Sequence, residues 1–266
     1  MPVNDRAWLR EQIARLLRDA GSIALASAKG TPRQWTKAGN SPVSEADIAV
    51  NDFLTTHLPP LVPDAGWLSE ETEDNRTRLQ AKAIWIVDPI DGTRAYLEGR
   101  EDWSVSVALV DNGRPSVTGL YAPARDEMFL AVRGEGATLN GARLSASAGR
   151  ALDGARLAGP QSYLRRFAEM NPSIVPQAKI HSLALRIARV AAGVIDGAFA
   201  SRNSHDWDLA AADLLVHEAG GALTDLEGRV VRYNRAETAH GALVAAGQDR
   251  HGALLELVRD RRSEFA

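Results

Sequence analysis

The sequence of 266 residues contains no cysteine, which excludes disulfide bonds, thiolate nucleophiles and zinc or iron–sulfur sites with cysteine ligands. An excess of one charge is also missing. The 31 basic and 34 acidic residues give a formal net charge of −3, so there is no electrostatic reason to expect binding of a nucleic-acid polymer. No apolar run approaches the roughly 18 residues that a membrane-spanning helix needs. We therefore expect a cytoplasmic protein that binds neither nucleic-acid polymers nor membranes.

What the chain does contain is an ordinary globular composition, with 45% hydrophobic and 24% charged residues. Its length suits one large domain or two closely packed subdomains. Apolar residues at helical spacing predict an amphipathic helix from Met1 to about Gly21, and not a signal peptide. Ser, Ala and Gly cluster at 145–149 and predict a boundary. This boundary divides the chain into an N-terminal α+β subdomain, 1–145, and a C-terminal α/β subdomain, 146–266.

Different patterns lie on the two sides of this boundary. Before it, strand signals dominate, and Asn140–Gly141 is a hairpin signal, so we expect an antiparallel sheet. After it, strand and helix signals alternate. The expected strands cover 84–87, 103–110, 117–121, 128–132, the hairpin 134–144, and 156–159, 195–200 and 243–246; the expected helices after the first cover 45–58, 163–170, 183–192, 209–219 and a last segment to about 261.

The most informative stretch is an apolar run that stops at two carboxylates. The β-branched and aromatic residues of 84–87 predict a strand buried on both faces, and Pro89 and Gly92 predict that the chain then leaves the sheet. Asp88 and Asp91 would lie at the strand end and in the following loop. Two carboxylates 4 Å apart repel by about 4 kcal/mol at an effective dielectric constant of about 20, which favours a bound cation. Oxygen ligands select a hard ion such as Mg²⁺. The alternative is that the segment forms only a tight turn.

Further carboxylates that can complete a metal site lie upstream and downstream. Glu70 and Glu71 follow a short apolar segment that predicts a strand end. The alternative for this pair is a solvated acidic loop with Ser69 as a helix cap. Asp208 falls in the first turn of the helix expected at 209–219. There the helix macrodipole stabilises an acid by typically 0.3 to 1 kcal/mol, which is a sufficient structural explanation.

Three segments together resemble one family. Glu70-Glu71, Asp88-Pro-Ile-Asp91-Gly-Thr93 and Trp207-Asp208-Leu-Ala-Ala follow each other in the order and spacing typical of the inositol monophosphatase superfamily of magnesium-dependent, lithium-sensitive phosphatases. The similarity extends from Ser41 to Gly221. It implies a layered αβαβα sandwich of the inositol monophosphatase and sugar phosphatase type, in the α+β or α/β class. It also implies a hydrolase that cleaves a phosphate monoester.

The resemblance assigns the chemistry to residues of the three segments. The Glu70, Asp88, Asp91 and Asp208 carboxylates and the Ile90 carbonyl would bind two or three Mg²⁺ ions, which activate a water for in-line attack and stabilise the leaving alkoxide. Glu70 and Thr93 would orient or deprotonate this water, and Asp91 would be shared between ions. The backbone N–H groups of Gly92 and Thr93 would bind a phosphate oxygen.

Outer residues receive supporting roles from the same resemblance. Glu71 would hold its neighbours in place, and Asp47 and Lys37 would lie around metal-bound water. For Asp47 a purely structural explanation is equally strong, because Ser44-x-x-Asp47 is a helix capping box. Gly39-Asn40 replaces the acidic residue that relatives often have just before Ser41-Pro42.

The expected substrate pocket departs from that of an inositol enzyme. Relatives that act on inositol phosphates often carry a Glu seven positions before the Asp of the Trp-Asp motif, where this chain has Ser201. His181-Ser182 stands in place of the usual Gly-Ser. Arg94 and Arg100 lie in a segment that resembles the bacterial 3'(2'),5'-bisphosphate nucleotidase branch, where they would meet a second phosphate; surface solubility is the other explanation. The substrate-binding residues implied are Gly92, Thr93, Arg94, Ser182 and Asp208.

We therefore expect a small phosphorylated metabolite as partner, with 3'-phosphoadenosine 5'-phosphate as the first candidate, and a homodimer as a further interaction. The neighbouring enzyme class is a phosphatase acting on inositol-1-phosphate, histidinol phosphate or fructose-1,6-bisphosphate. The alternative outside enzymes is a sensor of a phosphorylated metabolite or metal that has kept the fold and lost turnover. The sequence does not determine the substrate, the oligomeric state, the number of ions or the regulation.

Overall fold

The computed structural model describes residues 3–28, 33–36 and 42–265 of the chain. The helices in this part are α1 (Val3–Ala28), α2 (Glu45–His57), α3 (Thr93–Leu97), α4 (Gln161–Met170), α5 (Leu183–Ala191), α6 (Asp206–Glu218) and α7 (Gln248–Val258). The strands are β1 (Gln34–Thr36), β2 (Pro42–Ser44), β3 (Gly66–Ser69), β4 (Ala83–Asp91), β5 (Ser104–Asp111), β6 (Arg114–Ala122), β7 (Glu127–Val132), β8 (Gly136–Leu139), β9 (Ala142–Arg143), β10 (Arg156–Ala158), β11 (Val175–Pro176), β12 (Gly197–Ala200), β13 (Ser204–His205), β14 (Gly221–Asp225), β15 (Ala239–His240) and β16 (Leu243–Gly247).

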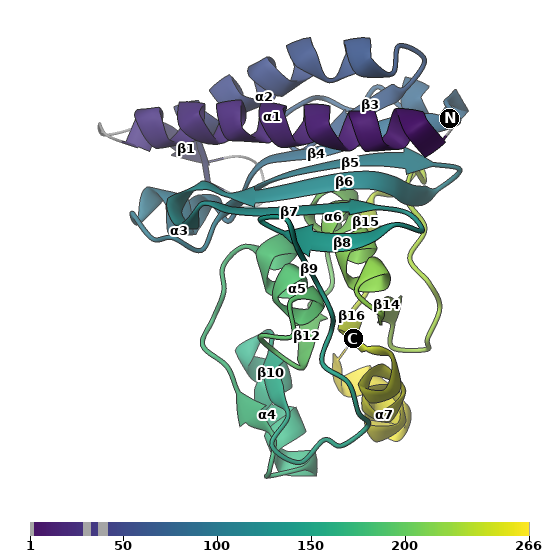
Figure 1. The fold of residues 1–266 in the computed structure, drawn as a ribbon. Coiled ribbons are helices and arrows are strands. Elements are labelled where there is room, and N and C mark those ends of the chain that lie inside the picture. Colours follow the sequence, from purple (N-terminus) through teal and green to yellow (C-terminus); the bar gives the residue numbers. More distant parts are fainter. Residues whose placement is uncertain (1–2, 29–32, 37–41, 266) are drawn as a thin grey trace.

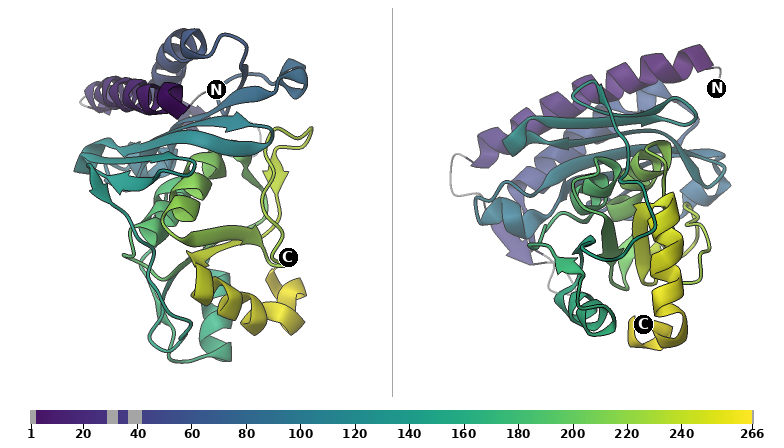
Figure 2. Two further views of the ribbon diagram at one scale, coloured as in Figure 1. Left: turned by 45° about the vertical axis from the view of Figure 1, so that its right-hand side comes forward. Right: turned by 60° about the horizontal axis from the view of Figure 1, so that its bottom comes forward.

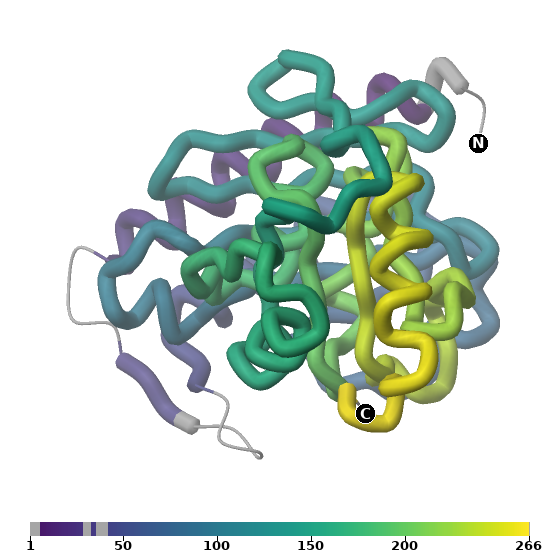
Figure 3. Tube along the Cα trace, turned by 90° about the horizontal axis from the view of Figure 1, so that it is seen from below, coloured from purple at the N-terminus to yellow at the C-terminus, as the bar shows by residue number. Residues whose placement is uncertain are grey.

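The elements form five alternating layers, so the predicted αβαβα sandwich is confirmed. Figure 1 shows α1 and α2 above the large sheet, α5 and α6 below it, the smaller sheet next, and α4 and α7 at the bottom. The same layers are visible from two other directions in Figure 2. Seen from below in Figure 3, α4 and α7 lie in front of the smaller sheet. None of the described helices is long and apolar enough to cross a membrane.

The large sheet has the strand order β3-β4-β5-β6-β7-β8-β9. All neighbours pair antiparallel except β3 and β4, which are parallel, so the predicted antiparallel sheet is present with one parallel addition. The predicted hairpin joins β8 and β9. Asn140 and Gly141 have φ angles of 49° and 84°, and two positive φ angles are what the tight turn of such a hairpin requires.

The small sheet has the order β11-β10-β12-β16-β14. The chain passes from one sheet to the other between β9 and β10, near the boundary expected at 145. A single apolar core nevertheless includes residues of β4 to β8 and residues of α5, α6, β12 and β16. The division into subdomains 1–145 and 146–266 stays a prediction, and the two halves share this core.

Two element boundaries differ most from the sequence-based expectations. The first helix continues past Gly21 to Ala28. Gly21 does not end this helix; a Cβ there would lie 2.6 Å from the Tyr121 ring, so the glycine lets α1 lie close against β6. The strand expected at 84–87 continues to Asp91, because a β-bulge after Asp88 accommodates Pro89 inside the strand.

Candidate metal centre and active site

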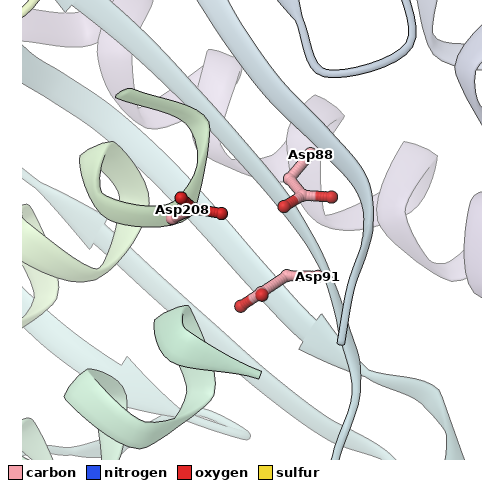
Figure 4. A group of neighbouring side chains, drawn as sticks. All are labelled: Asp88, Asp91 and Asp208. Carbon is pink, nitrogen blue, oxygen red and sulfur yellow. The ribbon is translucent and has the colours of Figure 1, made fainter. Parts of the chain in front are cut away.

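The bulge in β4 brings two carboxylates to the same side of the sheet. Asp88 pairs with Ser106 and Asp91 with Ser104, so three steps along β4 match two steps along β5. In a regular strand, residues three apart point to opposite faces, and the extra residue of the bulge cancels this alternation. Asp91 was expected in the loop after the strand but is still paired with β5. The side chains of Asp88 and Asp91 point into the same space in Figure 4.

The neighbouring strand β3 delivers Glu70 to the same edge. Ser69 lies opposite Val87 in the parallel pair, and the Glu70 N–H donates to the Val87 carbonyl oxygen at 3.3 Å. Parallel strands end at the same edge of a sheet, so Glu70 arrives beside Asp88. Glu70 and Glu71 therefore lie just past the end of β3, as expected.

Helix α6, which packs against β4 and β5, supplies the fourth carboxylate. Asp208 lies in its first turn, and its Oδ2 accepts the His205 N–H at 2.6 Å as part of a capping box. One carboxylate oxygen each of Asp88, Asp91 and Asp208 lies within 4.8 Å of the other two (Figure 4). Asp208 thus has both a structural role at the helix start and a position in the acidic cluster.

Burial and mutual repulsion disfavour the charged forms of the acids in this cluster. Burial, and then the charges of Glu70, Asp91 and Asp208, raise the pKa of Asp88 well above its usual value. Both oxygens of Asp88 are buried and have no hydrogen-bond partner among the described residues. Burial and the charge of Asp91 likewise raise the pKa of Asp208. An orphaned carboxylate within an all-oxygen donor set fits a hard divalent cation.

Asp91 is held differently, by three donors from the start of α5. Its Oδ2 accepts from the Ser182 hydroxyl at 2.6 Å and the Ala184 N–H at 2.7 Å, and its Oδ1 accepts from the Leu183 N–H at 3.2 Å. Burial raises the pKa of Asp91, and these hydrogen bonds oppose the increase. Ser182 was expected to contact substrate. It is fully buried instead, and its hydroxyl donates to Asp91 and orients that carboxylate.

The acids open onto one cavity of about 340 Å³. It brings together residues of the three motifs, two positively charged side chains and a histidine. The cavity is lined by Pro42, Glu70, Asp88, Ile90, Asp91, Gly92, Thr93, Arg94, Lys179, His181 and Asp208. Arg100 is not in this lining. Its Nε donates to Asp102 Oδ1 at 2.9 Å, so its charge is used within the protein.

Asp47 caps α2, as the first of its two expected roles requires, and it also contacts a residue of the cavity; its expected place around metal-bound water stays a prediction. Its Oδ2 accepts from the Ser44 N–H and hydroxyl at 2.8 and 2.6 Å, which completes the predicted capping box of α2. Its Oδ1 accepts from the Thr93 hydroxyl at 3.1 Å. Burial raises the pKa of Asp47. Lys37 lies outside the described residues. Glu71 is not part of the cavity lining, and its N–H donates to the Ser69 hydroxyl at 3.3 Å.

Lys179, His181 and Asp102 were missed by the sequence interpretation. The first two line the cavity, and Asp102 binds His181 through its carboxylate. The signal for His181 was present, since a histidine stands where relatives have glycine. No local pattern could reveal Lys179 or Asp102, because they join the site only in the fold, where Asp102 and Ser182 pack against Gly92.

Comparisons with known proteins agree with this geometry. The model of the inositol monophosphatase family matches residues 5–263. Nus factor SuhB of Escherichia coli strain K12 is 34% identical over 262 residues, which cover 94% of this chain and 95% of that protein. The solved structure of suhB from Bartonella henselae is 28% identical with a TM-score of 0.84, covering 95% of this chain and 99% of that chain. The IMPase of Thermotoga maritima is 26% identical with a TM-score of 0.83, covering 95% and 97%.

Proposed function

The chain belongs to the inositol monophosphatase family, and on this premise we propose that it is a Mg²⁺-dependent phosphomonoesterase acting on a small phosphorylated metabolite. The observation that carries the proposal is the Asp88 carboxylate, which is 1% exposed and has both oxygens without a hydrogen-bond partner among the described residues. It faces Asp91 and Asp208, whose oxygens lie within 4.8 Å. A fold that keeps three acids together in this way gains from a bound divalent cation.

The residues that would hold two or three Mg²⁺ ions are the four carboxylates of the cluster and a backbone oxygen: Glu70, Asp88, Asp91, Asp208 and Ile90. When bound, Mg²⁺ supplies Lewis acidity toward the phosphate and makes a water nucleophilic at neutral pH. Because Ser182, Leu183 and Ala184 fix the Asp91 carboxylate, that ligand is oriented before any ion arrives.

The chain's own proton acceptors for the attacking water would be Glu70 and Thr93. The Thr93 hydroxyl lies within hydrogen-bond distance of Asp47 Oδ1 and of the Ile90 carbonyl, at 3.1 and 3.0 Å. Thr93 can therefore accept from water while it donates to Asp47, which orients the water's lone pair. The raised pKa of Asp47, caused by burial, makes this carboxylate a stronger acceptor at the end of the path. Arg94 and Lys179 supply positive charge in the same cavity for the substrate anion.

For the substrate itself we propose 3'-phosphoadenosine 5'-phosphate, which makes the protein a 3'(2'),5'-bisphosphate nucleotidase. The support is the charge of Arg94 and Lys179 beside the acidic cluster, which suits a second phosphate. Lys179 also lines an adjoining cavity of about 360 Å³, into which a leaving group can extend. Ser201 lies in that cavity, where an inositol enzyme would offer a carboxylate.

A polyol phosphate such as inositol-1-phosphate is the second candidate, and one observation favours it. The lining of the adjoining cavity includes Gln161, Gln177 and Ser201 and no aromatic side chain from the described residues. Amide and hydroxyl groups suit sugar hydroxyls, whereas a nucleobase would have no stacking partner there.

Phosphate release tests both candidates. Purified protein is given 3'-phosphoadenosine 5'-phosphate, inositol-1-phosphate, histidinol phosphate or fructose-1,6-bisphosphate, each with Mg²⁺ or with EDTA. We expect release only with Mg²⁺, and kcat/KM for the bisphosphate nucleotide at least about tenfold above that for inositol-1-phosphate. A reversed ratio would favour the polyol phosphate. Absence of turnover on all four, together with calorimetric binding of Mg²⁺ and inorganic phosphate, would favour a sensor instead of an enzyme.

A further inference from the structure

His181 is held in the cavity by an arrangement that fixes its ring. Asp102 Oδ2 accepts from the His181 N–H at 2.8 Å and pairs with His181 Nδ1 at 2.7 Å, while Arg100 donates to Asp102 Oδ1 at 2.9 Å. The Asp102 carbonyl oxygen accepts the Ser182 N–H at 3.1 Å. Arg186 donates from Nη2 to the Ile180 carbonyl at 3.1 Å. The segment carrying His181 is thus tied down on both sides of the residue.

The protonation pattern of this ring follows from its partner. Although burial opposes it, hydrogen bonds from His181 and Arg100 lower the pKa of Asp102 to about 2. The carboxylate is therefore charged and can only accept, so Nδ1 of His181 carries a hydrogen. Nε2 has no hydrogen-bond partner within residues 3–28, 33–36 and 42–265, although the side chain is only 14% exposed. With Nδ1 turned to Asp102, the edge with Nε2 is the part left to line the cavity.

The position of His181 relates the acidic cluster to the adjoining cavity. Lys179, two residues earlier, lines both cavities, and Ser182, the next residue, binds Asp91. The wall made by 179–182 therefore runs from the acids toward the space for the leaving group. The charged groups around His181 are Asp102 and Arg100 behind the ring; those in the cavity are Glu70, Asp88, Asp91, Arg94, Lys179 and Asp208.

We propose that His181 is a further catalytic residue, which gives its Nε2 proton to the ester oxygen of the departing alcohol while Asp102 acts as its positioning residue. The proposal rests on the proposed phosphatase function. A bond forms between the water oxygen and phosphorus, and the bond from phosphorus to the ester oxygen breaks. The electron pair stays on the ester oxygen, which takes the proton from Nε2 and leaves as an alcohol. The imidazole regains a proton from solvent, and the negative ester favours its protonated form while substrate is bound.

The decisive variant is His181→Asn, because the Asn amide can still donate to Asp102 from nearly the position of Nδ1 but has no counterpart of Nε2. His217→Asn, at the exposed end of α6, is the matched control. Two substrates are compared with Mg²⁺ present: an alkyl phosphate, whose alcohol leaves poorly, and p-nitrophenyl phosphate, whose phenolate leaves without help. We expect kcat for the alkyl ester to fall about 100-fold in His181→Asn and kcat for the aryl ester to stay within about threefold.

Equal losses on both esters would overturn the proposal, since His181 would then serve the phosphoryl group or the fold; unchanged rates would overturn it as well. Asp102→Asn tests the positioning role. Loss of its negative charge disfavours protonated His181, so the alkaline limb of the kcat profile for the alkyl ester should move to lower pH. An unshifted limb would overturn the role of Asp102.

A binding readout keeps the test independent of turnover. In ¹⁵N-labelled protein with Mg²⁺, the His181 ring signals are assigned by their absence in His181→Asn. Addition of inorganic phosphate should move the Nε2 signal toward the protonated position, and a stationary signal would overturn the proposal. If the wild type hydrolyses neither ester, the proposed function fails by itself, and the ring signal still decides whether Nε2 meets the anion.

Discussion

Two buried charged side chains, Arg78 and Asp88, are treated by the fold in opposite ways. Arg78 is 2% exposed, and its Nε and Nη2 donate to Asp74 at 3.0 and 2.7 Å. Its Nη1 donates to Asn234 Oδ1 and the Arg235 carbonyl at 2.9 and 3.0 Å. Asp88 is 1% exposed, and neither of its oxygens has a hydrogen-bond partner among the described residues. Both charges lose their hydration, but only Arg78 regains hydrogen bonds within the protein.

This difference separates a charge that stabilises the fold from one that is kept for a ligand. A buried charge without partners costs several kcal/mol, so a chain retains it only where something outside the chain completes it. Arg78 joins the 74–78 segment to the 234–235 loop, and each of its three nitrogens donates at least one hydrogen bond. Asp88 remains open toward the cavity. Substituting Asp88 and Arg78 in turn tests this difference.

The largest effect is expected for Asp88→Asn on catalysis. The amide is a poor ligand for Mg²⁺, so we expect kcat/KM to fall by about 10³-fold or more. The metal-free protein should be as stable as the wild type or more stable, because a buried unpaired charge has been removed. Phosphate release and urea unfolding in EDTA measure the two outcomes. A destabilised metal-free variant would show that Asp88 has a structural partner.

A matched change, Asp91→Asn, sharpens this expectation. It should also abolish turnover, but the metal-free protein should lose about 1 to 3 kcal/mol of unfolding free energy, because the amide presents an NH₂ group to donors. Those donors are the Ser182 hydroxyl and the Leu183 and Ala184 N–H groups. Equal stability of the two variants would contradict the distinction drawn between the two acids.

On the structural side, Arg78→Met should cost about 3 kcal/mol of unfolding free energy, because it removes the partner of Asp74 and leaves two loop acceptors unpaired. The kcat of the folded protein should change little. Arg229→Ala, which breaks an exposed ion pair with Asp225, is the control and should change the unfolding free energy far less than Arg78→Met does. Denaturant unfolding measures both; a small cost for Arg78→Met would show that its hydrogen bonds are replaced by water.

The same comparison explains what the sequence could predict. Asp88, Asp91 and Asp208 were found because each follows a local signal, a buried strand or a helix start, and because a metal needs several acids. The strands of 103–132 and the helices of 183–219 were predicted for a related reason, because their periodicities reflect the burial of each element. Local information was sufficient for these elements and for the separate acids, whereas the layered arrangement and the grouping of the acids in one site were implied by the family resemblance.

Features that depend on contacts between distant segments were not predictable. The bulge that keeps Asp91 in β4 depends on pairing with β5. Gly21 lies inside α1 and does not end it, because the helix lies close to the ring of Tyr121 at this point. His181 attracted notice only as a departure from glycine, since its partner Asp102 lies 79 positions away. A hydrogen-bonded pair of this separation leaves no periodic signal in a single sequence.

Metal binding gives the next effect in size. On the proposed function Mg²⁺ would bind the folded protein only, so at about 100 times its dissociation constant it should raise the unfolding free energy by about 2.7 kcal/mol. Asp88→Asn should lose most of this gain, whereas Arg78→Met should keep it. Thermal unfolding with Mg²⁺ or EDTA measures the gain in each protein. The same gain in Asp88→Asn as in the wild type would place the ion elsewhere.

The smallest effect concerns Asp213, a buried acid intermediate between the two extremes. It is 5% exposed, and the Tyr233 hydroxyl donates to its Oδ2 at 3.1 Å. Burial, only partly offset by this bond, raises its pKa from 3.8 to about 6. The folded protein therefore holds the Asp213 proton more tightly than the unfolded chain does. The stability that this proton confers is present in full at the acid end and is lost as pH rises through the folded pKa, with no further change at higher pH.

Asp213→Asn is neutral at every pH and keeps an oxygen for Tyr233, so it should unfold with nearly the wild-type free energy at about pH 4. At about pH 8 it should be more stable by about 1 to 2 kcal/mol, with the whole difference developing between those values. Urea unfolding across this range in EDTA measures it, because the acids of the metal site titrate alike in both proteins and cancel in the difference. Asp52→Asn, an exposed change on α2, is the control for the substitution of a carboxylate by an amide. A flat difference for Asp213→Asn would mean that Tyr233 satisfies the charged form of this acid, which would place it with Arg78 among the fully paired charges.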